Sequence, residues 1–199
     1  MTKLEKLRNR VARELEKFDL NEVLPYLKYI SAGGMNDVKS EDGQSNYYQW
    51  LTNLMKVNKP RQIVELGGAM GVSALMILAG LPKKSKLYSI TLEELGLEFS
   101  FIKEKYPQLR MIIGNDLDLS SWPKDLDLEK TDIWFIDTEH EANQLRSELR
   151  IYRPFFKKGA IVLIDDIYLN DMYQVWLEIT YPKLALPELH WSGFGMFIT

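Results

Sequence analysis

The stretch from residue 63 to residue 79 constrains the fold of this chain more than any other. An apolar run that carries Glu65 ends at Gly67, and closely spaced glycines then lead into the apolar segment 74–79. This order predicts a buried strand, a tight turn and a helix, the arrangement found where nucleotide-binding α/β domains bind a ligand at the end of their first strand. Glycine is expected in such a turn because a Cβ would keep the backbone away from the ligand.

The glycine spacing and the acid before it indicate what kind of ligand the turn accepts. From Gly67 the chain reads G-x-A-x-G, through Ala69 to Gly71, whereas a dinucleotide site has G-x-G-x-x-G. Glu65 would repel a pyrophosphate and suits a ligand with a cationic end. A nicotinamide-dependent oxidoreductase is therefore disfavoured. It stays open as an alternative, together with a non-catalytic cofactor-binding module.

Composition excludes several classes of protein. The net charge of −3 and the pI near 5.5 argue against a nucleic-acid partner, which usually binds a basic surface. The charged first residues do not resemble a signal peptide, no apolar run is long enough for a membrane span, and cysteine is absent. We expect a cytoplasmic protein with a small-molecule partner. The sequence leaves its oligomeric state open, a homo-oligomer being one option.

Strand-like and helix-like segments alternate after residue 59, which predicts an α/β fold. We expect a doubly wound, Rossmann-like sheet of seven strands, mainly parallel, that ends in a C-terminal antiparallel hairpin with its turn at Ser192-Gly193. The predicted strands are 62–66, 86–91, 110–113, 132–137, 160–165, 188–191 and 194–199, and the predicted helices between them are 72–80, 93–106, 139–151 and 170–181.

The chain is expected to form one compact domain with two parts. Residues 1–58 form an N-terminal segment with helices predicted near 4–18, 24–30 and 45–58, and residues 59–199 form the ligand-binding domain. Paired glycines, Gly33 and Gly34, lie in the loop between the second and third of these helices. We predict that the surrounding segment, 31–43, closes over a bound ligand.

Three carboxylates follow apolar strands. Asp137 ends the strand 132–137, while Asp165 and Asp166 end the strand 160–165. The carboxyl ends of parallel strands lie at one edge of a sheet, so these groups are expected to converge near the glycine turn. Oxygen ligands in such a cluster favour magnesium, manganese or calcium. The alternative is that Asp165 or Asp166 simply caps the following turn.

The motif from Glu65 through Gly67 and Gly71 to Ser73 resembles motif I of the class I S-adenosylmethionine-dependent methyltransferases. With the three aspartates, the chain resembles the metal-dependent O-methyltransferases of the catechol and caffeoyl-CoA type, and more closely a related group with D-x-x-H after the fourth strand. The resemblance covers about residues 63–167. It implies methyl transfer from S-adenosyl-L-methionine to a hydroxyl of a small molecule, with Mg²⁺ or another divalent cation at Asp137, Asp165 and Asp166.

The same resemblance implies roles for further residues. His140, three residues after Asp137, is in the position of the general base, although it can also be a surface or helix-capping histidine. His190 is interpreted as structural. The residues expected to contact the cofactor are Glu65, Gly67, Gly68, Ala69, Gly71, Ser73, Thr91, Glu93, Asn115, Asp116 and Asp137.

The resemblance is incomplete at the second strand. An acid normally ends that strand and binds the ribose hydroxyls, but Thr91 stands there and Glu93 follows two residues later. Glu93 can reach back to the ribose, or it can be a first-turn acid that stabilises the next helix. Asn115 and Asp116 lie where the family places a polar group near the adenine, and they can also be plain turn residues.

Overall fold

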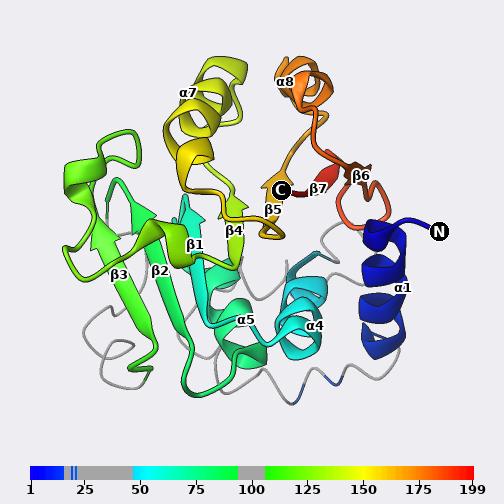
Figure 1. Cartoon of the computed structure of the whole chain (residues 1–199), viewed down its shortest axis with the longest axis horizontal. Helices are drawn as coiled ribbons and strands as arrows, with labels where there is room; N and C mark the ends of the chain where they lie inside the picture. The colour runs from blue at the N-terminus through cyan, green and yellow to red at the C-terminus, as the bar shows by residue number, and fades with distance from the viewer. Residues whose placement is uncertain (16–18, 20, 22–46, 94–105) are drawn as a thin grey trace.

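The structure is a computed structural model and describes residues 1–15, 19, 21, 47–93 and 106–199. Its centre is a seven-stranded sheet with the order β3-β2-β1-β4-β5-β7-β6 (Figure 1). The α/β fold with a seven-stranded, mainly parallel sheet is therefore confirmed. The strands are β1 (Gln62–Leu66), β2 (Lys86–Thr91), β3 (Leu109–Ile113), β4 (Ile133–Ile136), β5 (Ile161–Asp165), β6 (Lys183–Ala185) and β7 (Phe194–Ile198).

The parallel part of the sheet places the ends of its central strands side by side. β1 lies between β2 and β4, and Leu66 is in register with both Ile90 and Ile136. These strands are buried along almost their whole length because helices cover both faces of a parallel sheet. The order of strands reverses between β1 and β4, and open α/β sheets bind their ligands in the crevice at such a point.

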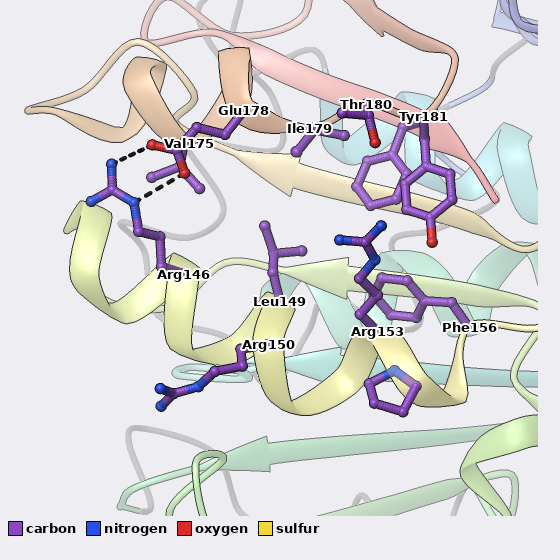
Figure 2. Close-up of a pocket in the computed structure, with 12 residues that line it drawn as sticks. Arg146, Leu149, Arg150, Arg153, Phe156, Val175, Glu178, Ile179, Thr180 and Tyr181 are labelled. Carbon is purple, nitrogen blue, oxygen red and sulfur yellow. Dashed lines mark hydrogen bonds and ion pairs between the residues drawn. The ribbon is translucent and has the colours of Figure 1, made fainter.

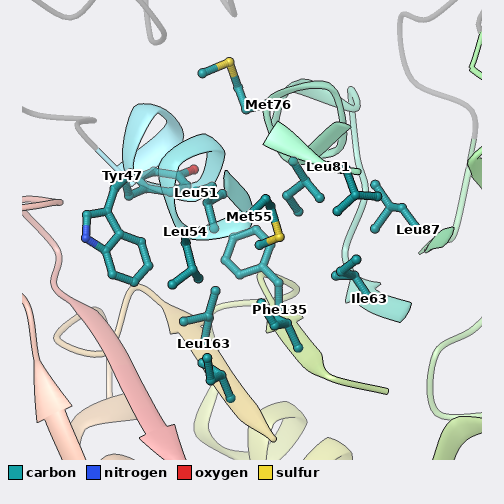
Figure 3. Packing of buried hydrophobic residues seen from close by; sticks show 14 of the residues in the cluster. Tyr47, Leu51, Leu54, Met55, Ile63, Met76, Leu81, Leu87, Phe135 and Leu163 are labelled. Carbon is teal, nitrogen blue, oxygen red and sulfur yellow. The ribbon is translucent and has the colours of Figure 1, made fainter. Parts of the chain in front are cut away.

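The helices divide into two layers, each with its own buried cluster. The helices α1 (Lys3–Leu15), α4 (Tyr47–Asn58) and α5 (Val72–Gly80) pack on one face, where Leu54 and Met55 of α4 point towards Phe135 and Leu163 of the sheet (Figure 3). The helices α7 (Ala142–Tyr152) and α8 (Met172–Glu178) cover the other face. Three short 3-10 helices, η2 (Leu119–Ser121), η3 (Leu128–Lys130) and η4 (Arg153–Phe155), complete the described part of the chain. None of the described helices is long and apolar enough to cross a bilayer.

The predicted strand 188–191 is wrong. The chain does turn near Ser192, where the Gly193 amide donates to the His190 carbonyl at 3.0 Å, but the turn does not join two paired strands. The antiparallel partner of β7 is β6, with Lys183 opposite Phe197. The segment between them folds back onto the end of β5, where the amide of Tyr168 donates to the Ser192 carbonyl at 2.7 Å. Leu189 and Trp191 look like alternating strand residues, but the segment instead directs the polar side chains of His190 and Ser192 towards Asp165 and Asp166.

Most other predicted elements agree with the structure within a few residues. β1, β2 and α5 have the predicted bounds, and α8 is shorter at both ends than the predicted 170–181. The predicted helix 24–30 lies outside the described residues. Of the predicted helix 93–106, only residues 93 and 106 are described. The predicted closing segment, 31–43, also lies outside the described residues. Within the described part, α1 and α4 share one buried cluster with the sheet.

The contact between α4 and α5 depends on a glycine. Gly80 is the last residue of α5, and a Cβ added there would collide with the main-chain carbonyl oxygen of Thr52 in α4. Thr52 also donates its hydroxyl to the Met76 carbonyl at 2.8 Å, so the two helices are joined by a buried hydrogen bond. The backbones can approach this closely only because residue 80 lacks a side chain.

We expect Gly80→Ala to lower the free energy of unfolding by about 1–3 kcal/mol, because the methyl group has to push α4 away. Chemical denaturation measures the change. Helix propensity alone favours alanine over glycine, so it predicts the opposite sign. Ala79→Gly measures the propensity effect at the neighbouring position. A Gly80→Ala variant as stable as the parent would show that α4 is not held against α5 in this way.

Candidate functional site

A cleft of about 320 Å³ lies at the carboxyl ends of β1, β2, β3 and β4. It occupies the crevice where the strand order reverses. Seven of the predicted cofactor residues line it, namely Gly67, Ala69, Thr91, Glu93, Asn115, Asp116 and Asp137. Glu65, Gly68, Gly71 and Ser73 do not line it.

The glycine turn is held tightly between the neighbouring strands. Gly67 has a φ of 89°, and a Cβ there would collide with the main-chain oxygen of Asp137. A Cβ at Gly68 would collide with the hydroxyl of Ser89, and the amides of both glycines donate to the Ile90 carbonyl at 3.0 and 2.9 Å. Gly67 and Gly68 are therefore required by the packing of β1 against its neighbours, besides any approach of a ligand.

Glu65 is a buried carboxylate without a hydrogen-bond partner of good geometry among the described residues. Burial raises its pKa to about 7, while the nearby hydroxyls of Ser73 and Ser89 act in the opposite direction. A buried charged group is costly unless it is paired. The site therefore contains an acid that a cationic or hydrogen-bond-donating group would stabilise.

A polar network that sequence reasoning missed supports one wall of the cleft. The side-chain amide of Gln144 donates to Oδ2 of Asp116 at 3.2 Å and to Oε1 of Glu148 at 2.8 Å. Thr138 donates its hydroxyl to the same Glu148 oxygen at 2.6 Å. Gln144 and Glu148 are four residues apart and so share one face of α7. That spacing is the only signal of the network in the sequence, because Asp116 and Thr138 come from other segments.

The network also fixes Asp116. The hydroxyl of Tyr152 donates to the Asp116 carbonyl and in turn accepts a hydrogen bond from the Trp122 indole at 2.8 Å. Burial, together with the hydrogen bond and the negative charge of Asp116, raises the pKa of Glu148 to about 8. Glu148 is therefore mostly uncharged at neutral pH.

Beside the cleft, the structure brings together the three predicted aspartates and both histidines. Nε2 of His140 lies 2.8 Å from Asp166 and 3.4 Å from Asp137. Nδ1 of His190 lies 2.9 Å from Asp165 and 3.3 Å from Asp166. Asp137 belongs to this cluster and also lines the cleft, so the two sites adjoin.

The structure places His190 in this acidic cluster, and no pattern in the sequence predicts that position. This histidine was interpreted as structural, and its imidazole pairs with two of the three aspartates and lies 5.0 Å from the Tyr47 ring, centroid to centroid. His190 and Asp165 are 25 positions apart in the sequence, and only the fold-back of the segment before β7 brings them together.

The histidines and aspartates of this cluster shift one another's pKa. Hydrogen bonds to Asp137 and Asp166 raise the pKa of His140 to about 10. Asp165 and Asp166 raise that of His190 to about 10, against the effect of burial. Asp166, which also accepts a hydrogen bond from Ser192, has a pKa well below the usual range for aspartate. Burial and the neighbouring carboxylates raise the pKa of Asp137.

The donor atoms of this cluster suit a divalent cation. One oxygen from Asp137, one from Asp166 and a nitrogen of His140 lie within 4.8 Å of one another, and Asp165, Asp166 and His190 form a second such group. Carboxylates are the ligands of magnesium and manganese, and the imidazoles extend the range to other transition metals. Since the histidines already neutralise part of the charge, the cluster is also stable as a set of ion pairs.

Comparison with known proteins identifies the family. A methyltransferase domain family model matches residues 64–167, which include the glycine turn, the cleft and the three aspartates. The chain belongs to this methyltransferase family. No match was found among curated proteins by sequence.

Solved structures share the fold of this methyltransferase. An O-methyltransferase from Bacillus cereus in complex with S-adenosylhomocysteine is 15% identical with a TM-score of 0.63, over 90% of this chain and 91% of that one. A candidate caffeoyl-CoA O-methyltransferase from Staphylococcus aureus is 20% identical with a TM-score of 0.64, over 91% and 100%. A methyltransferase from Podospora anserina bound to S-adenosylhomocysteine is 16% identical with a TM-score of 0.62, over 100% and 97%.

We expect Glu148→Gln to change the pH dependence of stability. The pKa of Glu148 is near 8 in the folded protein and near 4.5 in the unfolded chain, so the folded state retains a proton that the unfolded state loses. The parent should therefore lose stability, on the order of 2–4 kcal/mol, as pH rises from about 4.5 to 8. Glutamine imitates the protonated acid and should remove the part of the decline that Glu148 causes, while the parts due to Glu65 and Asp137, whose pKa values are also raised, should remain. Denaturant unfolding at several pH values measures it.

Glu178→Gln is the matched control. Glu178 is exposed, and its pairing with Arg146 lowers its pKa, so this variant should keep the decline between pH 4.5 and 8. Equal slopes for the parent and Glu148→Gln would mean that Glu148 is ionised in the folded protein.

Proposed function

We propose that this methyltransferase moves the methyl group of S-adenosylmethionine to a hydroxyl of a small molecule. One observation carries the proposal, namely that Asp137 both lines the cleft and belongs to the acidic cluster. A cofactor in the cleft would therefore present its reactive end beside groups that can hold and deprotonate an acceptor. Methyl transfer is an in-line displacement, so alignment of the two reactants is the main task of the protein.

The cationic end of the cofactor has a suitable partner in Glu65. The amino group of S-adenosylmethionine can approach the glycine turn, behind which the unpaired carboxylate of Glu65 lies. A nicotinamide dinucleotide offers a pyrophosphate instead, which this acid would repel. Family membership and this charge together favour a methyltransferase over the oxidoreductase. If the protein bound the cofactor but transferred no methyl group, the alternative of a non-catalytic cofactor-binding module would be supported.

Thr91 and Glu93 are our candidates for the ribose. Both line the cleft, and the Thr91 hydroxyl donates to the Glu93 carbonyl at 3.2 Å, which holds the chain close after β2. The Glu93 carboxylate can accept from the ribose hydroxyls.

Gln144 and Asp116 are our candidates for the adenine. Both side-chain N–H groups of Gln144 are used by the carboxylates of Asp116 and Glu148. Its carbonyl oxygen accepts no hydrogen bond from a described residue, and Gln144 lines the cleft. The two hydrogen bonds fix the orientation of the Gln144 amide and leave its carbonyl oxygen free to accept. The exocyclic amine of adenine is a suitable donor to this oxygen.

For the metal, we propose that Asp137, Asp165 and Asp166 hold a divalent cation. Asp166 belongs to two groups of donor atoms that each lie within 4.8 Å of one another, with Asp137 and His140 in one group and Asp165 and His190 in the other. Carboxylate oxygens and imidazole nitrogens are both suitable ligands for such an ion. The ion would bind the acceptor oxygen and lower the pKa of its hydroxyl.

We propose His140 as the general base. Its imidazole is about one-third exposed and stands at the junction of the cleft and the cluster. While Asp137 and Asp166 both pair with it, its pKa stays near 10 and it cannot accept a proton at neutral pH. The role of base therefore requires one of these carboxylates to turn to another positive partner.

The cofactor assignment predicts selective binding of an adenine nucleoside. S-adenosylhomocysteine should bind in isothermal calorimetry, and S-inosylhomocysteine, whose base presents an oxygen in place of the amine, should bind about tenfold more weakly or worse. Gln144→Ala should reduce this ratio towards one, since the fixed acceptor is gone. NADH should not bind.

Gln174→Ala, on α8 and outside the cleft, is the control and should keep the discrimination. Binding of NADH without S-adenosylhomocysteine would overturn the cofactor assignment. Binding of S-adenosylhomocysteine with unchanged discrimination in Gln144→Ala would overturn only the role of Gln144.

The metal assignment predicts stabilisation by cations. Mg²⁺ or Mn²⁺ should raise the melting temperature of protein pretreated with a chelator, because only the folded state gathers the ligands. Asp166→Asn should abolish the rise. Asp166 has a φ of 57°, a conformation that asparagine tolerates, so the backbone should be preserved.

Asp171→Asn serves as its control. Asp171 accepts a hydrogen bond from the Ala142 amide at 3.1 Å and lies outside the cluster, so this variant should lower the melting temperature and keep the metal response. If neither ion raised the melting temperature of the chelator-treated parent, the metal assignment would be wrong. The methyltransferase assignment would not be affected.

A further inference from the structure

A second cavity, of about 560 Å³, lies between α7 and α8 and shares no residue with the cofactor cleft (Figure 2). Its volume is in the range of small-molecule pockets. Neither the acidic cluster nor the predicted site residues contribute to it. The cavity is therefore a separate feature of the molecule, and the inference drawn from it does not depend on the proposed function.

The cavity exists because the two helices are joined at one end and spread at the other. Near the start of α7, the Ala142 amide donates to Asp171, and the Asn170 amide donates to the His140 carbonyl at 2.6 Å. Further along, the guanidinium of Arg146 forms two hydrogen bonds with the Glu178 carboxylate, at 3.1 and 2.7 Å. Beyond this ion pair the cavity opens, with Leu149 pointing across the gap towards the α8 side (Figure 2).

The floor of the cavity is apolar and largely aromatic. The rings of Tyr181 and Phe197 are stacked, with centroids 5.4 Å apart and planes 5° from parallel. Phe156 packs against Phe197 at 6.0 Å, and Val175 and Ile179 add aliphatic surface. Such a surface binds the hydrocarbon part of a ligand through the hydrophobic effect.

Two cations of the cavity form no ion pair with a described carboxylate, and only one of them faces the gap. Arg146 is neutralised by Glu178, whereas Arg150 and Arg153 have no such partner among the described residues. The guanidinium of Arg153 lies 5.4 Å from the centroid of the Tyr181 ring and reaches across the gap, whereas Arg150 points away (Figure 2). A guanidinium held over an aromatic ring keeps donors free to bind a carboxylate through two hydrogen bonds.

We propose that this cavity binds an amphipathic monocarboxylate, with its carboxylate on Arg153 and its hydrocarbon part on the floor formed by Phe156, Tyr181 and Phe197. The positive charge of the cavity stands out in a chain whose net charge is −3. A single anionic group next to an apolar body matches the one unpaired guanidinium that reaches across the gap beside the apolar floor, because Arg150 points away. Glu178 would repel the second carboxylate of a dicarboxylate, and Arg153 would repel the charged group of a cationic amphiphile.

Calorimetric titration with octanoate tests the proposal. Octanoate should bind at one site, also when S-adenosylhomocysteine is present in excess, and octyltrimethylammonium should not bind. Arg153→Gln should weaken octanoate binding about tenfold, since a charge-assisted hydrogen bond is lost. Arg150→Gln removes the same charge three residues earlier, in α7, and should change the affinity less than about twofold.

Ile179→Trp provides a second variant because it fills the cavity without altering its charge. It should abolish octanoate binding while the melting temperature stays near that of the parent. The proposal is overturned if octanoate does not bind, if Arg153→Gln binds it as tightly as the parent, or if octyltrimethylammonium binds equally well. Displacement of octanoate by S-adenosylhomocysteine would also overturn it, because the carboxylate would then occupy the cofactor cleft.

Discussion

The close contact between Gly67 and the main chain of Asp137 is the constraint on which the rest of the site depends. It occurs where the strand order reverses, between the carboxyl ends of β1 and β4, and it leaves no room for a side chain at residue 67. Because the two strand ends touch, the cleft opens on one side of the contact and the acidic cluster on the other. Asp137 belongs to both for this reason. A larger residue at position 67 would separate the strands before it could block a ligand.

Around this contact, charge is balanced in two different ways. In the acidic cluster, two histidines neutralise aspartates at distances of 2.8–3.4 Å, so negative charge is paired with positive charge. In the wall of the cleft, no described cation pairs with Glu148, and this acid is kept protonated through its raised pKa instead. Both solutions follow from the cost of burying an unpaired charge.

The sequence predicts the fold well where the signal is local. The runs 62–66 and 86–91 are apolar on both faces and end at turn residues, so β1 and β2 have the predicted bounds. It fails at 188–191, where Leu189 and Trp191 alternate as in a strand. The amides of Ile167 and Tyr168, just after β5, donate to the carbonyls of Gly193 and Ser192, and these hydrogen bonds override that pattern. Convergence of the three aspartates follows from strand ends meeting at one edge. His190 and the pairing of Gln144 with Asp116 do not follow from any local pattern, because contacts distant in the sequence create them.

Under the proposed function, the cationic end of the ligand lies near Glu65, and ligand binding would then be linked to proton binding. With a pKa of about 7, this acid is close to half protonated in neutral solution. A cationic ligand that comes to rest against it favours the ionised form, so each binding event near pH 7 expels about half a proton on average. The affinity for such a ligand then rises with pH through the neutral range, and a ligand without positive charge escapes this dependence. A single carboxylate beneath a glycine turn thus makes the occupancy of the cleft sensitive to the acidity of its surroundings.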